Sequence, residues 1–227
     1  MRVTARAVIM ASVLGLVAGC ANTRPQAPPG IPEASAMAPS SSVAGRLTWI
    51  AQDANFAKYT SIIIPPVTVY DGADASWGDT SPADRATVAA YMQQQFTRAI
   101  AKQYPIVTAP GPTTARVQFQ LVGIESNVPV AATVSRLVPA GLVANIASQA
   151  AGQPGSFSGS VTYAALIYDS TTNRLIAAAV NKKFPEALNI GATFSTVDAA
   201  KAGIDEGATQ LAQGIQMLRS GRARTGS

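Results

Sequence analysis

The residue types that carry out most enzyme chemistry are scarce in this chain of 227 residues. It contains no histidine and a single cysteine, Cys20. Histidine is the side chain that most often acts as a general base near neutral pH and as a metal ligand, so both roles are excluded. One thiol cannot form an internal disulfide or a thiolate zinc site. A serine nucleophile would need a lysine base, and the sequence has no Ser-x-x-Lys motif.

Carboxylates are the remaining candidates, and one loop around Trp77 holds four of them. A loop-type calcium site ends with a glutamate at its twelfth position, and the twelfth residue counted from Asp71 is Pro82. We therefore predict structural roles for these acids, with no metal site and no cofactor. The four residues are Asp71, Asp74, Asp79 and Asp84.

A hydrolase acting on cell-wall sugars is an alternative that would need two converging carboxylates, about 5 to 10 Å apart. Asp169 and Glu125 could be combined with the loop acids, but Asp169 begins a predicted turn and Glu125 ends a predicted strand. No glycine-rich phosphate-binding motif follows a strand. We expect a protein that is not an enzyme.

The net charge of +5 comes from the two ends of the chain. Two arginines lie within residues 1–19 and three within residues 219–227, and without these five the basic and acidic residues are equal in number. Nucleic-acid binding needs several phosphate contacts from one face. We therefore predict no nucleic-acid partner, and we interpret residues 219–227 as a basic disordered tail, with contact to anionic lipid or cell wall as the alternative.

Residues 1–19 have the pattern of a signal peptide, with two arginines followed by an apolar run that is too short to span a membrane. Val17-Ala18-Gly19-Cys20 resembles the bacterial lipobox. This resemblance implies that Cys20 becomes the acylated first residue of the mature protein, which makes the membrane a partner through the lipid anchor. Ala21, where some lipoproteins of the inner membrane have aspartate, implies the periplasmic face of the outer membrane. An ordinary secretory leader with a chance or buried cysteine is the alternative.

The rest of the chain divides into a tether, residues 20–42, and a single domain, residues 43–218. The tether is rich in proline and serine and would reach about 70 Å if extended. The domain has strand-like and helix-like segments in an order that predicts an α+β fold, with one mostly antiparallel sheet of four to five strands and two main helices on one face. Residues 115–122 alternate with period two, which predicts a sheet with one buried face. The predicted strands are 59–64, 105–108, 115–122, 157–169 and 175–184, and the predicted helices begin at Ser81 and Ser195.

Residues 127–154 are apolar but interrupted, and they fit neither period cleanly. Val138, Leu142 and Ile146 suggest a short helix. This helix would either pack on the free face of the sheet or form a partly exposed apolar surface that contacts a partner. The three residues are the candidate interaction surface of the chain.

Several short motifs together resemble a family of bacterial lipoproteins known as domain of unknown function 3313. They include the lipobox, Tyr59 leading to Ile64, and Asp169 with Thr172 before Leu175; the others are Pro66, Val67, Val69, Trp77-Gly-Asp79, Ser81-Pro82, Asp84, Tyr104, Val107, Pro110-Gly111-Pro112 and Ile176-Ala177-Ala178. The turn Asn173-Arg174 departs from the Gly-Glu expected there. The resemblance covers residues 45–218 and implies an envelope location, but it implies no reaction and no catalytic residue.

These observations predict a non-catalytic envelope lipoprotein that binds another envelope component, with an envelope protein as the candidate partner. The alternative is a periplasmic carrier or sensor of an apolar small ligand, held between the sheet and residues 130–150. Such a site would enclose about 300 to 1,000 Å³.

Overall fold

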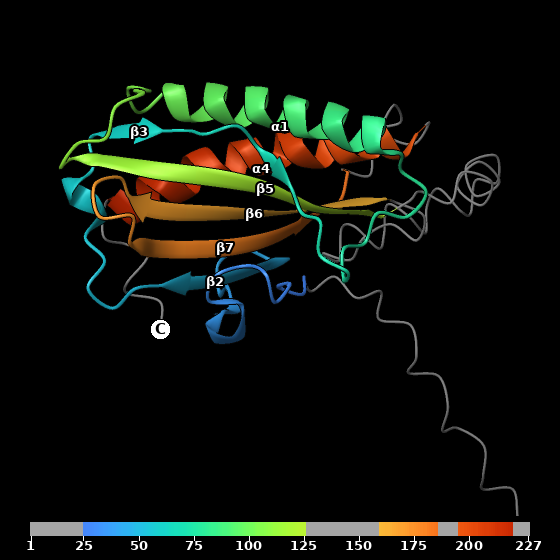
Figure 1. The fold of residues 1–227 in the computed structure, drawn as a ribbon, viewed down its shortest axis with the longest axis horizontal. Coiled ribbons are helices and arrows are strands. Elements are labelled where there is room, and N and C mark those ends of the chain that lie inside the picture. The colour runs from blue at the N-terminus through green and yellow to red at the C-terminus, as the bar shows by residue number, and fades with distance from the viewer. Residues whose placement is uncertain (1–24, 126–158, 186–194, 220–227) are drawn as a thin grey trace, which may run out of the picture.

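The computed structural model describes residues 25–125, 159–185 and 195–219. They form two layers, a sheet with helices α1 (Pro82–Ala101) and α4 (Thr196–Arg219) side by side on one of its faces (Figure 1). The α+β class and the two helices on one face are as predicted.

The sheet is larger than predicted and it is mixed. It has seven strands in the order β1-β2-β7-β6-β5-β3, and β4 also pairs with β5. Strands β3 and β4 run parallel to β5, and all other pairs are antiparallel. The strands are β1 (Ala38–Pro39), β2 (Arg46–Ile50), β3 (Ser61–Ile63), β4 (Thr68–Val69), β5 (Thr114–Glu125), β6 (Ser160–Asp169) and β7 (Leu175–Lys183).

The prediction of a mostly antiparallel sheet with four to five strands was therefore wrong in two respects. Strands β1 and β4 have two residues each, which is too short for a periodic pattern to show in the sequence. In the chain, helix α1 follows β3 and β4 and precedes β5. A connection through a helix brings the chain back parallel to the strand that it left, so β5 runs parallel to β3 and β4.

Helix α1 begins where the sequence predicted. The Ser81 hydroxyl accepts a hydrogen bond from the Asp84 amide, and the Asp84 carboxylate accepts one from the Ser81 amide, which completes a capping box. The helix turns one apolar stripe toward the sheet, and four members of this stripe, spaced four residues apart, are fully buried: Val88, Met92, Phe96 and Ile100.

Helix α4 approaches the sheet closely because it presents small residues to it. Its start is capped by Ser195, whose hydroxyl accepts from the Asp198 amide at 3.0 Å. A Cβ atom at Gly207 would lie 2.4 Å from the Tyr163 hydroxyl oxygen, and one at Gly203 would lie 2.8 Å from a Val161 methyl carbon. Larger residues at these two positions would push the helix away from β6.

The main core lies between the helices and the sheet, and three aromatic rings form its centre. Phe96 of α1 meets Phe119 of β5 and Tyr163 of β6 edge to face, at 4.8 and 5.0 Å between ring centroids. All three side chains are buried. Buried residues of β5 alternate with half-buried ones, as the period-two alternation of residues 115–122 predicted for this face of the sheet.

The opposite face of the sheet is also covered, which differs from the expectation of one buried face. Ile31, 2% exposed, packs with Leu47, Val122 and Val180 in a second core. Part of the predicted tether supplies this cover, since residues 27–37 lie against the sheet and β1 pairs with β2. Among the described residues of the predicted tether, 27–39 are therefore held against the domain rather than standing free of it; residues 20–24 lie outside the described part.

Candidate functional site

The residues predicted to carry function lie outside the described ranges. They are Cys20 and the three members of the candidate interaction surface, Val138, Leu142 and Ile146. The described residues on either side of residues 126–158 are neighbours, because Glu125 ends β5 and pairs with Ser160 at the start of β6. Both attachment points of that stretch are thus at one end of the sheet.

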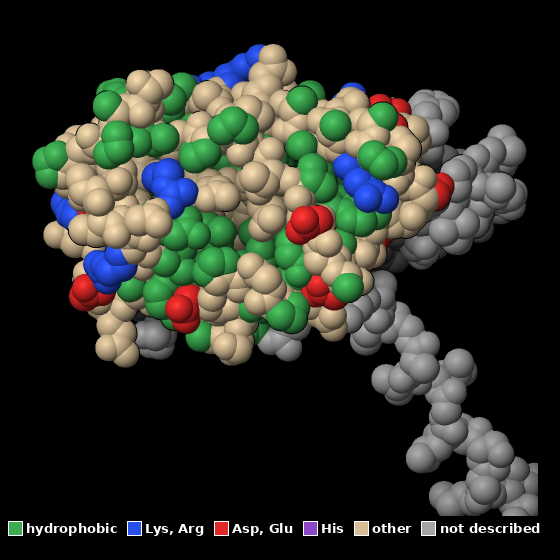
Figure 2. Space-filling model, viewed as in Figure 1, with side chains coloured by type: hydrophobic (Ala, Val, Ile, Leu, Met, Phe, Trp, Pro, Cys, Tyr) green, Lys and Arg blue, Asp and Glu red, His purple; other side chains and the backbone are tan. Residues whose placement is uncertain are grey.

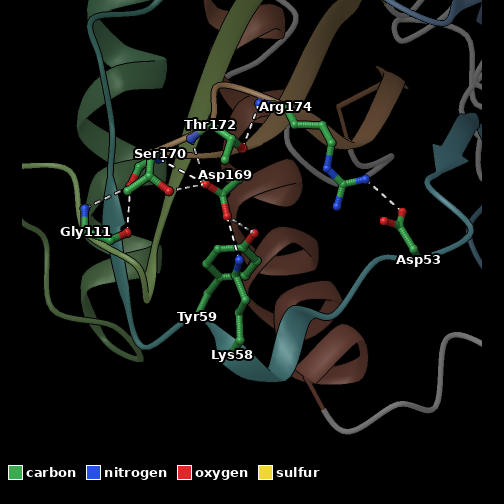
Figure 3. Close-up of polar contacts among 9 residues, drawn as sticks. Asp53, Lys58, Tyr59, Gly111, Asp169, Ser170, Thr172 and Arg174 are labelled. Carbon is green, nitrogen blue, oxygen red and sulfur yellow. Dashed lines mark hydrogen bonds and ion pairs between the residues drawn. The ribbon is translucent and has the colours of Figure 1, made fainter.

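The densest polar cluster in the described residues surrounds Asp169, at the turn between β6 and β7 (Figure 3). Asp169 is 4% exposed. One carboxylate oxygen, Oδ2, accepts hydrogen bonds from Lys58 Nζ at 2.6 Å and from the Tyr59 hydroxyl at 2.9 Å. Lys58 and Tyr59 come from the 3-10 helix η2 (Phe56–Lys58) and the residue after it.

The other carboxylate oxygen of Asp169, Oδ1, holds the turn itself. It accepts from the Thr171 amide at 3.0 Å, the Thr171 hydroxyl at 2.6 Å and the Thr172 amide at 3.0 Å. The ion pair with Lys58 and these donors keep the pKa of Asp169 well below its usual range. A carboxylate that stays charged and accepts five hydrogen bonds holds its neighbours in place but is poorly suited to proton transfer.

Two further contacts connect this turn to other segments (Figure 3). The Gly111 amide donates to the Ser170 hydroxyl, which donates to the Gly111 carbonyl, both at 3.1 Å. Arg174 forms an exposed ion pair with Asp53 at 2.8 Å. The cluster therefore joins the hairpin turn to the loop before β5 and to the segment that leads into η2. Sequence motifs had included Tyr59, Asp169 and Thr172, but nothing in the pattern indicated Lys58.

The acids around Trp77 have separate partners. Asp74 accepts a hydrogen bond from the Tyr70 hydroxyl at 2.7 Å, and Asp84 belongs to the helix cap. The Arg85 guanidinium lies over the Trp77 ring, 4.8 Å from its centroid. Within the described residues, no three acids come close enough to hold a metal ion together.

A second charged cluster lies between α4 and the strands β2 and β7, and no sequence motif indicated it. Lys183 has a side chain only 4% exposed, 3.6 Å from the Glu206 carboxylate, and it also donates to Gln210. Burial lowers the pKa of Lys183. Beside it, Arg46 Nε donates to Asn181 Oδ1 at 2.6 Å. These groups satisfy one another at the edge of the helix layer.

Glu125 and Asp169, the acids considered as a glycosidase pair, lie at opposite ends of the β5–β6 pair. Glu125 is opposite Ser160, whereas Asp169 is opposite Ala115. Nine residues of strand separate Ser160 from Asp169, which corresponds to about 30 Å. This distance is far beyond the 5 to 10 Å that glycoside hydrolysis needs.

Three described cavities bear on ligand binding. The apolar one, between α4, η2 and the sheet, encloses about 50 Å³ and is lined by Tyr59, Tyr104 and Leu211, among others. This is well below the 300 Å³ that small-molecule sites usually enclose. A groove of about 450 Å³ follows the seam between α1 and α4, and a polar one of about 320 Å³ lies beside residues 25–29. On the face shown in Figure 2, charged side chains of both signs are interspersed with hydrophobic ones.

None of the helices within the described ranges combines the length and the apolar character needed to cross a bilayer.

The described residues thus define an α+β domain whose buried polar clusters are internally paired. The chain belongs to the family described as "Protein of unknown function (DUF3313)", whose model matches residues 29–211. No curated protein matches the chain.

Solved structures with a similar arrangement include three bacterial proteins. One is a protein from Xanthomonas campestris assigned to family DUF330, with 12% identity, a TM-score of 0.40, and coverage of 73% of this chain and 88% of that one. A PelC dodecamer from Paraburkholderia phytofirmans has 7% identity, a TM-score of 0.37 and coverage of 71% and 92%. A candidate lipoprotein from Caulobacter crescentus CB15 has 10% identity, a TM-score of 0.33 and coverage of 74% and 96%.

Proposed function

We propose that this protein is a non-catalytic lipoprotein, anchored through acylated Cys20 to the periplasmic face of the outer membrane, that binds another envelope component. The observation that carries the proposal is the position of the only cysteine, directly after an apolar leader and two small residues, Ala18 and Gly19. More than one acyl chain at Cys20 would make attachment stable, since each buried methylene contributes about 0.8 kcal/mol. Ala21 supports the outer membrane, and density-gradient separation of the two membranes tests this destination.

Replacing Cys20 with serine is expected to abolish acylation and to lower the membrane-bound fraction by roughly tenfold or more, because the anchor supplies the attachment. Cell fractionation measures the distribution, and intact mass spectrometry measures the mature N-terminus. Asn22→Ser, two residues away, serves as the matched control and should remain acylated. A wild-type protein whose mature N-terminus carries no acyl chain would contradict the proposal.

The absence of catalysis is part of the proposal, and two observations support it. Glu125 and Asp169 are too far apart to act on one bond, and the oxygens of Asp169 are occupied by internal donors. The carrier alternative places its ligand between the sheet and residues 130–150, and those residues lie outside the described ranges. The apolar cavity among the described residues encloses about 50 Å³, less than ligand sites usually enclose, so it does not supply a site for an apolar ligand.

For the binding role we propose the apolar stretch that contains Val138, Leu142 and Ile146. Leu142→Glu together with Ile146→Glu is expected to remove a crosslinked partner while the thermal unfolding midpoint stays unchanged, because charge at an exposed apolar contact disfavours association. Crosslinking in intact cells with mass spectrometry, beside thermal unfolding of the purified protein, makes this measurement.

Asn145→Glu together with Gln149→Glu is the matched control, since it adds the same two charges, four residues apart, at positions that are already polar. If the paired glutamates instead lower the unfolding midpoint, or if the partner is retained, the stretch is a packing element and the binding role must lie elsewhere.

A further inference from the structure

The place where the packed part of the chain begins limits how far the domain can stand from its anchor. Pro25 and Pro28 are buried. Residues 25–29 line the 320 Å³ cavity together with Glu125, Thr162 and Lys182. The first described residues are therefore fixed against one end of the sheet, where β5 ends and β6 begins.

Other parts of the fold identify this end of the molecule, here called the leader end. Lys183, at the end of β7, is opposite Val161, near the start of β6. Helix α1 starts there too, because the Ile124 amide bonds to the carbonyl of Ser76, just before the helix. The hairpin turn with Asp169 lies at the other end, about 30 Å away along β6 (Figure 1).

Only four residues lie between Cys20 and Pro25, so five residue-to-residue steps join the two. Whatever the conformation of this linker, five steps span at most about 18 Å. This is much less than the reach of about 70 Å that a tether up to residue 42 would allow. The domain is also longer than this linker, residues 21–24, so the linker restricts which end of the domain can reach the bilayer.

We infer that the leader end of the domain rests on the headgroup layer of the phospholipid bilayer that holds the acyl chains of Cys20, and that the Asp169 hairpin end points away from it. The inference rests on the proposed acylation. A short linker keeps the leader end at a high effective concentration near the lipid, so contact between this end and the headgroups needs little intrinsic affinity. Among the described residues at this end, Glu125 and Lys182 form an ion pair at 2.7 Å, so these two charges are balanced.

The two ends of α1 offer a matched pair of positions for a test. Ala83 and Ala101 are both exposed alanines, in the first and last turns of the helix, about 27 Å apart. Acylation consumes the thiol of Cys20, so a cysteine introduced at either position is the only free thiol. Each can carry the same fluorophore.

The full-length acylated variants Ala83→Cys and Ala101→Cys are labelled and reconstituted in phosphatidylcholine vesicles that contain headgroup-attached nitroxide lipids. We expect the label at position 83 to be quenched at least about threefold more strongly than the label at position 101, given their separation along the helix. Equal quenching, or stronger quenching at position 101, would overturn the inference, as would a partner protein found between the domain and the lipid.

A longer linker between Cys20 and Pro25 tests whether its short length sets the orientation. Twenty Gly/Ser residues inserted between Thr23 and Arg24 add a mean reach of about 25 Å, so the difference in quenching is expected to fall by half or more. If the difference in quenching between positions 83 and 101 remains after the insertion, the linker does not set the orientation. Intact mass spectrometry of the reconstituted protein distinguishes failure of the proposed acylation from failure of the proposed orientation. Missing acyl chains would refute the proposed function, whereas acylated protein with equal quenching would refute only the orientation.

Discussion

Replacing Asp169 with alanine is expected to destabilise the domain by about 2 to 4 kcal/mol. The substitution leaves the amides of Thr171 and Thr172 and the Tyr59 hydroxyl without their acceptor, and it removes the ion pair with Lys58. Lys58 is 43% exposed and can be hydrated again, so most of the loss comes from the donors in the turn and from Tyr59. Urea unfolding measures the change as a lower midpoint at constant slope.

Asp53→Ala provides the matched control, because it also removes a carboxylate that pairs with a cation at this end of the molecule. The side chain of Asp53 is 72% exposed, and its bond to Arg174 is a surface ion pair. Such pairs contribute little, so no measurable change in the unfolding midpoint is expected. If the two variants lose similar stability, the cluster around Asp169 does not lock the turn.

The same carboxylate makes a pH dependence predictable. The folded-state pKa of Asp169 lies below its unfolded value of about 3.9, so the unfolded chain takes up the proton more readily. Its stabilising contribution is fully present above about pH 5 and is lost as the pH falls through 3.9 and below. Asp169→Asn should therefore flatten the loss of stability in acid relative to the wild type, and urea unfolding at pH 3 to 7 measures this.

Phe96→Ala is expected to destabilise the domain by about 3 to 5 kcal/mol. The ring is fully buried and contacts both Phe119 and Tyr163 edge to face, so its removal deletes two aromatic contacts and leaves a cavity between helix and sheet. The two partner rings belong to neighbouring strands, which limits how far the site can collapse. Thermal and urea unfolding both measure the loss.

Phe96→Leu tests the explanation, since it keeps part of the volume but no aromatic ring. It should retain a good part of the stability that alanine loses. Met92→Leu, one turn earlier on the same buried stripe, conserves volume and should cost less than about 1.5 kcal/mol. If Phe96→Ala lowers the free energy of unfolding no more than Met92→Leu does, the three aromatic rings are not the centre of the core.

Periodic segments were predictable from the sequence because burial on one face leaves a direct trace in residue order. The stripe from Val88 to Ile100 and the cap at Ser81 define α1, and the alternation of Val117, Phe119 and Leu121 places β5 against the helices. The strands around Asp169 were likewise recognisable, as was the turn between them.

Elements without a period were not predictable. Strands β1 and β4 are two residues long, and they form because neighbouring strands offer free hydrogen-bonding edges. Composition favoured an extended tether over residues 20–42, yet single apolar residues such as Ile31 find a partner surface on the far side of the sheet. A composition average does not register one well-placed side chain.

The sequence by itself determined the absence of histidine chemistry, the single cysteine after an apolar leader, and the two amphipathic helices, since these depend on residue type and local spacing alone. Only the tertiary structure decided that Lys58 and Tyr59 meet Asp169, that Glu125 lies a strand length away from Asp169, and that the packed chain begins five residues after Cys20. Each of these facts depends on how segments distant in sequence are placed against one another. Strand register and the covering of the second face create them, and no local pattern encodes either.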